Sequence, residues 1–291
     1  MRILHTKTTA LTKALAKKYA TMEPVPRERP LSQKRIRELC ADVKAKKTIV
    51  FQWAAAQVGN DVYRVNGQHT SHLFHTNPKL VNSGLRVNVT VYECKDMEEV
   101  AELYSKFDSG VSSRNAGDVN RVYAGTLESL MDMPTWLVNL CTTALAYAKW
   151  GEQYMAKRRE DRAQLLTKNE DFILFVQELS KTSGSGGFKF MKKGAVVAAI
   201  FETYKISEDF SRRFWTAVRD ATGISPDLPD RQLNNFLLTA TLNSGANILT
   251  NKSAATRREI FAKCIIAWNA YRKEEVTRLR YSPSKPLPTP I

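Results

Sequence analysis

The sequence predicts an α+β protein in which a mixed α/β domain is followed by an all-helical domain. Two observations carry this prediction. Runs of β-branched and aromatic residues, which favour strands, lie before about residue 93. From Asp132 onward, apolar residues recur instead at helical spacing. We expect four segments along the 291 residues: a basic N-terminal helix (1–23), the mixed domain (24–130), the helical domain (131–281) and a proline-rich tail (282–291).

The N-terminal segment is expected to be a helix with one apolar side. Leu4, Leu11, Leu15 and Tyr19 fall at roughly helical spacing, between threonines, alanines and lysines. Pro24 ends this helix, because proline has no amide hydrogen to donate inside one.

The mixed domain is expected to combine helices with three strands. Alternation of valine with polar residues over 85–92 predicts the clearest strand, with one face buried. Ser32 caps the first helix of this domain, and Asp96 with Glu99 forms a capping box for a later one. The predicted elements are helix 32–47, strand 48–53, strand 61–65, a short helix ending at 77–78, strand 85–92, helix 97–107 and a helix after the loop 108–118.

The second half is expected to be helical as far as the tail. Its predicted helices cover 134–150, 171–179, 195–204, 210–222, 231–242 and 254–273. The tail holds too many prolines for a helix and is expected to be extended.

The formal net charge of +15 is unevenly distributed. Residues 1–48 carry +9 and residues 252–291 carry +6, whereas the part between them is neutral. Basic ends on a neutral body favour a polyanionic partner, DNA or RNA, although a solubilising surface has the same composition. The residues expected to contact nucleic acid are Lys17, Lys18, Arg35, Arg257, Arg258 and Arg272.

Composition also argues against several other classes of protein. No apolar run approaches the ~20 residues that span a bilayer. The first residues lack the apolar core of a signal peptide. The four cysteines are far apart in the sequence and form no CxxC pair, which argues against a zinc ribbon or a disulfide framework. We therefore expect a cytoplasmic protein without membrane contact.

Three of the four histidines, His69, His72 and His75, lie within seven residues, directly after the predicted strand 61–65. Gly67 permits a tight turn there, and the next residues open a helix, whose N-terminus favours anions. On a helix His69 and His72 share a face and His75 points away, so a metal site would need ligands from elsewhere. We expect no metal site, and we regard His72 and His75 as ordinary packing or surface residues.

Two other motifs have simpler explanations. The run 183–187 lacks the GxxxxGK[ST] pattern and a preceding strand, so it is expected to be a linker and not a P-loop. Residues 197–219 could form a helix-turn-helix, but a plain antiparallel helix pair has the same pattern.

The order of elements around the turn resembles the ParB/sulfiredoxin superfamily. The resemblance rests on Arg27 and Arg29 before a helix, the sequence Asn-Gly-Gln-His-Thr at 66–70, and the sequence Phe-Asp-Ser-Gly at 107–110 followed by Arg114. It covers residues 24–121 and is nearest to phage and mobile-element ParB-like proteins with a DGQHR motif. The resemblance implies a ParB/sulfiredoxin-like mixed domain that binds nucleotide phosphates with the basic loop and the glycine turn.

Carried onto this sequence, the resemblance gives a set of candidate residues. Thr70 stands where the family usually has Arg, and threonine cannot supply a charged, planar phosphate fork. Arg29, Arg64 or Arg114 could restore that charge. The candidate phosphate-binding residues are Arg29, Asn66, Gly67, Gln68, His69, Thr70 and Arg114, and the catalytic candidates are His69 and Asp108.

These observations lead to one leading hypothesis and two alternatives. The first is a nucleotide- or nucleic-acid-binding protein, encoded by a phage or mobile element, acting in DNA metabolism, DNA modification or host-defence conflict. The first alternative is a nucleotide hydrolase or phosphotransferase of the same fold, with a nucleoside triphosphate and Mg²⁺ and with Asp108, Asp118 or His69 as base. The second is a non-enzymatic inhibitor of a host factor. Self-association is compatible with each.

Overall fold

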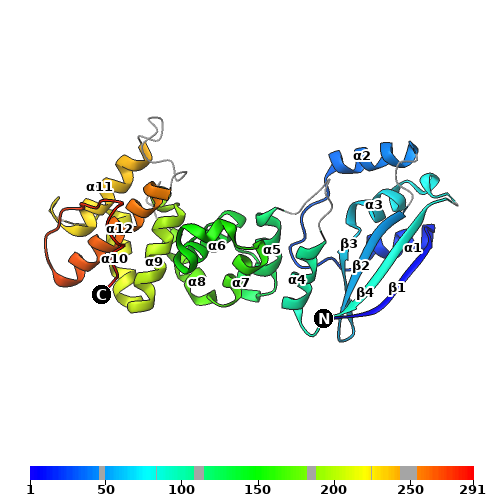
Figure 1. Cartoon of the computed structure of the whole chain (residues 1–291), viewed down its shortest axis with the longest axis horizontal. Helices are drawn as coiled ribbons and strands as arrows, with labels where there is room; N and C mark the ends of the chain where they lie inside the picture. The colour runs from blue at the N-terminus through cyan, green and yellow to red at the C-terminus, as the bar shows by residue number, and fades with distance from the viewer. Residues whose placement is uncertain (46–49, 83, 108–114, 182–187, 224, 243–253) are drawn as a thin grey trace. The chain divides into compact units, whose positions relative to one another are not determined.

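A computed structural model describes residues 1–45, 50–82, 84–107, 115–181, 188–223, 225–242 and 254–291. The chain forms two compact units, Met1–Met131 and Asp132–Ile291 (Figure 1). The first contains a four-stranded sheet with helices, and the described part of the second is helical. The predicted α+β class, with a helical C-terminal region, is confirmed.

The sheet of the first unit has the strand order β1-β4-β2-β3. Its strands are β1 (Arg2–Ala10), β2 (Val50–Val58), β3 (Asp61–Asn66) and β4 (Arg86–Glu93). The two central strands, β4 and β2, run parallel to each other, and each edge strand is antiparallel to its neighbour. The sheet is therefore mixed, with β1 and β3 at its edges.

The N-terminal helix predicted over 1–23 is wrong for its first half. Arg2–Ala10 is strand β1, paired with β4, and helix α1 covers only Lys13–Thr21. Thr12 caps this helix by accepting a hydrogen bond of 3.1 Å from Leu15 N. The β-branched residues Ile3, Thr6, Thr8 and Thr9 favour a strand once a partner is available. The leucines on both sides of Thr12 lie at roughly helical spacing, and this spacing led to the wrong prediction of a helix over β1.

Helices cover both faces of the sheet, which explains why the central strand β2 is apolar on both sides. Trp53 and Ala55 point to one face, where α1 and α3 (Gln68–Thr76) pack. Ala54 and Ala56 alternate with them and point to the other face. Helix α4 (Met97–Lys106) contacts β2 and lies beside the sheet (Figure 1). All four of these β2 side chains are buried, as expected of a central strand.

Local capping signals determine where several helices begin. The predicted capping interaction at Asp96 is confirmed, since its Oδ1 accepts from Glu99 N at 2.9 Å. The reciprocal bond of the predicted capping box is displaced by one residue, because Glu99 Oε2 accepts from the backbone N–H of Lys95 at 2.9 Å. Helix α2 (Gln33–Lys44) begins at the predicted cap, Ser32, and α5 covers Ala116–Gly125.

The described part of the second unit consists of helices and connecting segments. Trp215 and Trp268 lie fully buried at its centre, with Phe214 between them. Trp215 Nε1 donates to Thr203 Oγ1 at 2.9 Å, so its polar atom is satisfied inside the core. The helices are α6 (Thr135–Trp150), α7 (Arg159–Thr167), α8 (Glu170–Ser180), α9 (Gly194–Ile206), α10 (Glu208–Asp220), α11 (Pro229–Leu242) and α12 (Ala254–Lys273). The run 183–187 lies outside the described residues.

The proline-rich tail contains no helix and is held against α12. Asn269 accepts from Ile291 N at 3.1 Å and donates to Thr289 O at 2.9 Å. Arg272 and Trp268 both donate to the main-chain oxygen of Ile291. Among the described segments, no helix is long and apolar enough to cross a membrane.

Candidate functional site

The candidate turn connects the end of β3 to the beginning of α3, as the sequence indicated. Gly67 adopts a φ of +103°, a left-handed conformation that favours glycine, and Gln68 starts the helix. Gly67 also lies against the indole of Trp53, since a Cβ atom added there would be 2.6 Å from Trp53 Cδ1. Asn66 donates to Gln52 O at 2.9 Å and so fastens the end of β3 to β2. Conformation and close packing both require glycine at this position.

Thr70 is held in a hydrogen-bonded position beneath the turn. Its Oγ1 accepts from Trp53 Nε1 at 2.7 Å and donates to Gly67 O at 3.1 Å. Trp53 is 1% exposed, so Thr70 satisfies a polar atom that would otherwise be buried without a partner. The threonine found where the ParB-like motif has arginine is therefore a structural residue in this chain.

His69 joins the N-termini of two helices. Its Nε2 accepts a hydrogen bond of 3.0 Å from the backbone N–H of Ser32, the residue that caps α2. Gln68 adds a second tie from the same turn, because its Nε2 donates to Arg29 O at 2.8 Å. As a result, the first turns of α2 and α3 lie next to each other.

Positive charge gathers at this junction. Burial, followed by the charges of Arg29 and Arg35, lowers the pKa of His69 from 6.5 to about 4, with smaller contributions from His72 and Arg64. His69 is therefore neutral at pH 7, which fits its role as hydrogen-bond acceptor. Neither α2 nor α3 has an acidic residue in its first turn. No side chain of the described residues caps the N-terminus of α3.

The arginines near the turn have different partners. Arg29 lies 3.8 Å from Asp118, near the limit of an ion pair, whereas Arg35 pairs with Glu38 at 3.4 Å within α2. Arg64, which is 6% exposed, contacts the C-terminal end of α1 and Glu28. Its guanidinium donates to Tyr19 O at 2.9 Å and pairs with Glu28 at 2.7 Å. Arg64 therefore caps the C-terminal end of α1 with its guanidinium group.

The two candidate bases that the structure describes, His69 and Asp118, are both engaged in hydrogen bonds. His69 uses Nε2 to accept from Ser32, and its lowered pKa makes it a weak base. Asp118 Oδ2 accepts from Asn115 N at 3.0 Å in the capping box of α5. Asp108 and Arg114, the other two candidates of this region, lie outside the described residues.

The predicted nucleic-acid-binding residues divide into two groups. Lys17 and Lys18 are exposed on α1, and Arg35 lies beside the turn. The three C-terminal arginines are instead engaged within the second unit. Arg257 pairs with Glu152 at 2.6 Å, Arg258 donates to Tyr281 and Lys285, and Arg272 donates to Ile291 O. These contacts hold the start of α12 and the tail in place.

The remaining histidines do not assemble a metal site. His75 is exposed and His72 is half-buried on α3. Throughout the described part of the chain, no three His, Cys, Asp or Glu side chains lie close enough together to hold a metal ion.

The turn could be predicted from the sequence, but the residues that hold it in place could not. Trp53 is recognisable only as a strand residue, and Ser32 only as a helix cap. Their contacts to Thr70 and His69 join positions 17 and 37 residues apart. No local signal in the sequence reports either contact.

Comparison with known proteins adds no constraint on this site. No protein-family model matches the chain, and neither a curated protein nor a solved structure shows significant similarity to it.

Proposed function

We propose that this protein binds a phosphate-bearing ligand, nucleic acid or a nucleotide, where the N-termini of α2 and α3 meet. The hydrogen bond from Ser32 N to His69 Nε2 is the observation that carries the proposal, because it brings the two helix ends together. Arg29 and Arg35 lie close enough to this junction to lower the pKa of His69.

The helix N-termini and the arginines both favour a bound anion at this junction. The N-terminus of a helix carries a partial positive charge and N–H groups without partners inside the helix, and both favour a bound anion. The first turn of α3 has neither a capping side chain among the described residues nor an acidic residue. Phosphate oxygens would accept from these N–H groups and from the guanidinium groups of Arg29 and Arg35.

Binding is better supported than catalysis. A phosphate can be held by backbone N–H groups and arginines alone, whereas hydrolysis needs a base or a bound metal ion as well. Of the described candidates, His69 is a hydrogen-bonded acceptor with a lowered pKa, and Asp118 accepts from the backbone of Asn115 in the capping box of α5. The net charge of +15, with +9 in residues 1–48, favours a polyanion over a single nucleotide. A role in DNA metabolism, modification or host-defence conflict would follow from the ParB-like resemblance.

The test is fluorescence anisotropy with a short labelled duplex, a labelled single strand and a labelled nucleotide. Arg35→Glu reverses a charge beside the junction, and Arg37→Glu makes the same change two residues along α2, on another side of the helix. We expect Arg35→Glu to weaken binding about tenfold and Arg37→Glu to have a much smaller effect.

Salt dependence distinguishes a polyanion from a single nucleotide. For duplex DNA, the logarithm of the binding constant should fall with the logarithm of salt concentration by roughly 0.9 per phosphate neutralised. Absence of binding to all three probes at low salt, or equal losses in Arg35→Glu and Arg37→Glu, would refute the assignment of this junction.

A further inference from the structure

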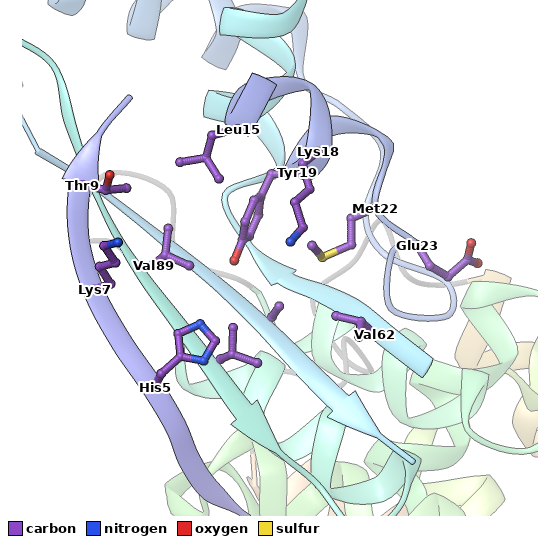
Figure 2. Close-up of a pocket in the computed structure, with 12 residues that line it drawn as sticks. His5, Lys7, Thr9, Leu15, Lys18, Tyr19, Met22, Glu23, Val62 and Val89 are labelled. Atoms are coloured by element: carbon purple, nitrogen blue, oxygen red, sulfur yellow. The ribbon is translucent and has the colours of Figure 1, made fainter. Parts of the chain in front are cut away.

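A pocket of about 530 Å³ lies on one face of the sheet (Figure 2). Its lining includes none of the residues whose contacts join α2 to α3. Its floor is apolar and consists of side chains from the sheet, among them Val62, Val89 and Val91. Helix α1 forms one wall with Tyr19 and Met22. The volume falls within the range of pockets that bind small molecules.

The register of the sheet explains why this pocket exists. His5 pairs with Val91 and Lys7 pairs with Val89, so these polar β1 side chains rise beside the valines of β4 on the same face. Helix α1 ends at Thr21 and leaves this part of the sheet uncovered, which is why Val62 is 38% exposed. An apolar floor beneath charged walls is typical of a ligand site.

The charged walls are mainly basic. Lys7 comes from β1 and Lys18 from α1, and neither forms an ion pair with a described residue. Figure 2 shows the Lys18 amine and the Tyr19 hydroxyl pointing into the space above the sheet. Glu23 also lines the pocket, but its carboxylate points away from both lysines in the same view.

Tyr19 contributes a neutral hydrogen-bond donor to this set. Burial raises the pKa of Tyr19 to about 12, so its hydroxyl keeps its proton at physiological pH. Its ring is held against Trp53, with centroids 4.9 Å apart. Two ammonium groups and a fixed hydroxyl suit an oxyanion, and the valine floor suits a hydrocarbon.

We propose that this pocket binds a fatty-acid-like carboxylate. Its carboxylate would lie between Lys7, Lys18 and the Tyr19 hydroxyl, and its hydrocarbon chain would cover Val62, Val89 and Val91. A nucleic-acid backbone suits the pocket less well, because its hydrated phosphates and sugars gain nothing from an apolar floor.

Isothermal titration of the full chain with dodecanoate tests the proposal. We expect saturable binding of one molecule per chain. Acetate has the charge without the hydrocarbon, and dodecyltrimethylammonium has the hydrocarbon with the opposite charge, so both should bind at least about tenfold more weakly.

Variants locate the ligand. Lys7→Glu and Lys18→Glu should each weaken dodecanoate binding about tenfold, and Val62→Glu should do the same by placing a carboxylate in the apolar floor. Lys17→Glu is the matched control, because Lys17 precedes Lys18 on α1, is exposed and does not line the pocket. Its affinity for dodecanoate should stay within about twofold of the unmodified chain. Arg35→Glu should also leave this binding unchanged, which separates this pocket from the α2–α3 junction.

Three outcomes would overturn the proposal. They are absence of saturable dodecanoate binding below its micelle concentration, equal affinity for dodecyltrimethylammonium, and equal losses in Lys17→Glu and Lys18→Glu. Displacement of bound dodecanoate by a short DNA duplex in the Arg35→Glu background would assign the lysines to nucleic acid instead.

Discussion

The indole Nε1 of Trp53 donates a 2.7 Å hydrogen bond to Thr70 Oγ1, and this bond joins the central strand β2 to the first turn of α3. Gly67 lies over the same indole. The three residues form one packed unit, so the shape of the turn depends on a tryptophan that lies outside the motif. Substitutions within this unit should therefore affect stability before they affect binding.

Gly67→Ala should destabilise the fold by more than about 2 kcal/mol, because the added methyl group meets Trp53 and the backbone has a positive φ. The control is Gly59→Ala, since Gly59 has a φ of +59° but no atom within 4 Å of the added carbon. That change should cost about 1 kcal/mol from backbone strain alone. Urea unfolding measures both, and equal losses would contradict the close packing.

Thr70→Val should lower the free energy of unfolding by about 1–3 kcal/mol, because the buried Trp53 Nε1 loses its acceptor. Thr70→Ser keeps the hydroxyl and should cost less. The near-ultraviolet circular dichroism of tryptophan gives a second measurement. Equal stability of the valine and serine variants would mean that the hydrogen bond contributes little.

The stability of the first unit should fall as pH is lowered from about 6.5 toward 4. His69 in the folded chain has a pKa of about 4, below its unfolded value near 6.5, so the unfolded chain binds the proton more readily in this range. The stabilisation is complete above pH 6.5, and its loss should be on the order of 2 kcal/mol. His69→Gln can accept from Ser32 without titrating and should reduce this pH dependence. His75→Gln, at an exposed position, should leave it unchanged.

Arg64→Ala should destabilise the first unit by about 3–5 kcal/mol, because it removes the buried ion pair with Glu28 and uncaps the end of α1. Arg2→Ala removes an exposed ion pair with Glu93 and should cost less than about 1 kcal/mol. Chemical denaturation of both variants gives the comparison. Similar losses would show that the buried Arg64–Glu28 pair contributes no more to stability than the exposed Arg2–Glu93 pair.

Asn269→Ala should release the tail from α12, because both of its hydrogen bonds to the tail are lost. Faster proteolysis within residues 282–291 and more rapid amide exchange at Ile291 should follow. Asn269→Asp keeps an acceptor for Ile291 N and should retain part of the protection. No change in either measurement would mean that Arg272 and Trp268 are sufficient to hold the tail.

Features encoded by neighbouring residues could be predicted from the sequence, and features made by distant contacts could not. Alternation of Val87 and Val89 with polar residues predicts β4, Gly67 predicts the turn, and Asp96 predicts a helix start. Strand β1 is different, because its partner β4 is far away, with Thr6 and Thr90 bonded across 84 positions. The threonines of β1 are compatible with helix or strand until that partner is present.

The same limit applies to the candidate site. The position of His69 and Thr70 at a helix N-terminus could be predicted from the sequence. The hydrogen bonds of His69 to Ser32 and of Thr70 to Trp53 could not. The C-terminal arginines are evident in the sequence, but the ion pair that Arg257 forms with Glu152 is not. No sequence pattern predicts the pocket over β4, because the pocket depends on where α1 ends above the sheet.

Pairing of β1 with β4 also sets the order in which the first unit can be assembled. The β2–β3 hairpin can form from adjacent residues, whereas β1 must wait until Arg86–Glu93 has left the ribosome. Strand β1, which precedes the other strands of the sheet in the sequence, is thus among the last to be paired. During that interval β1 and the edge of β2 that will pair with β4 are both without a partner and open to other chains. Slow elongation should therefore increase aggregation of the nascent protein.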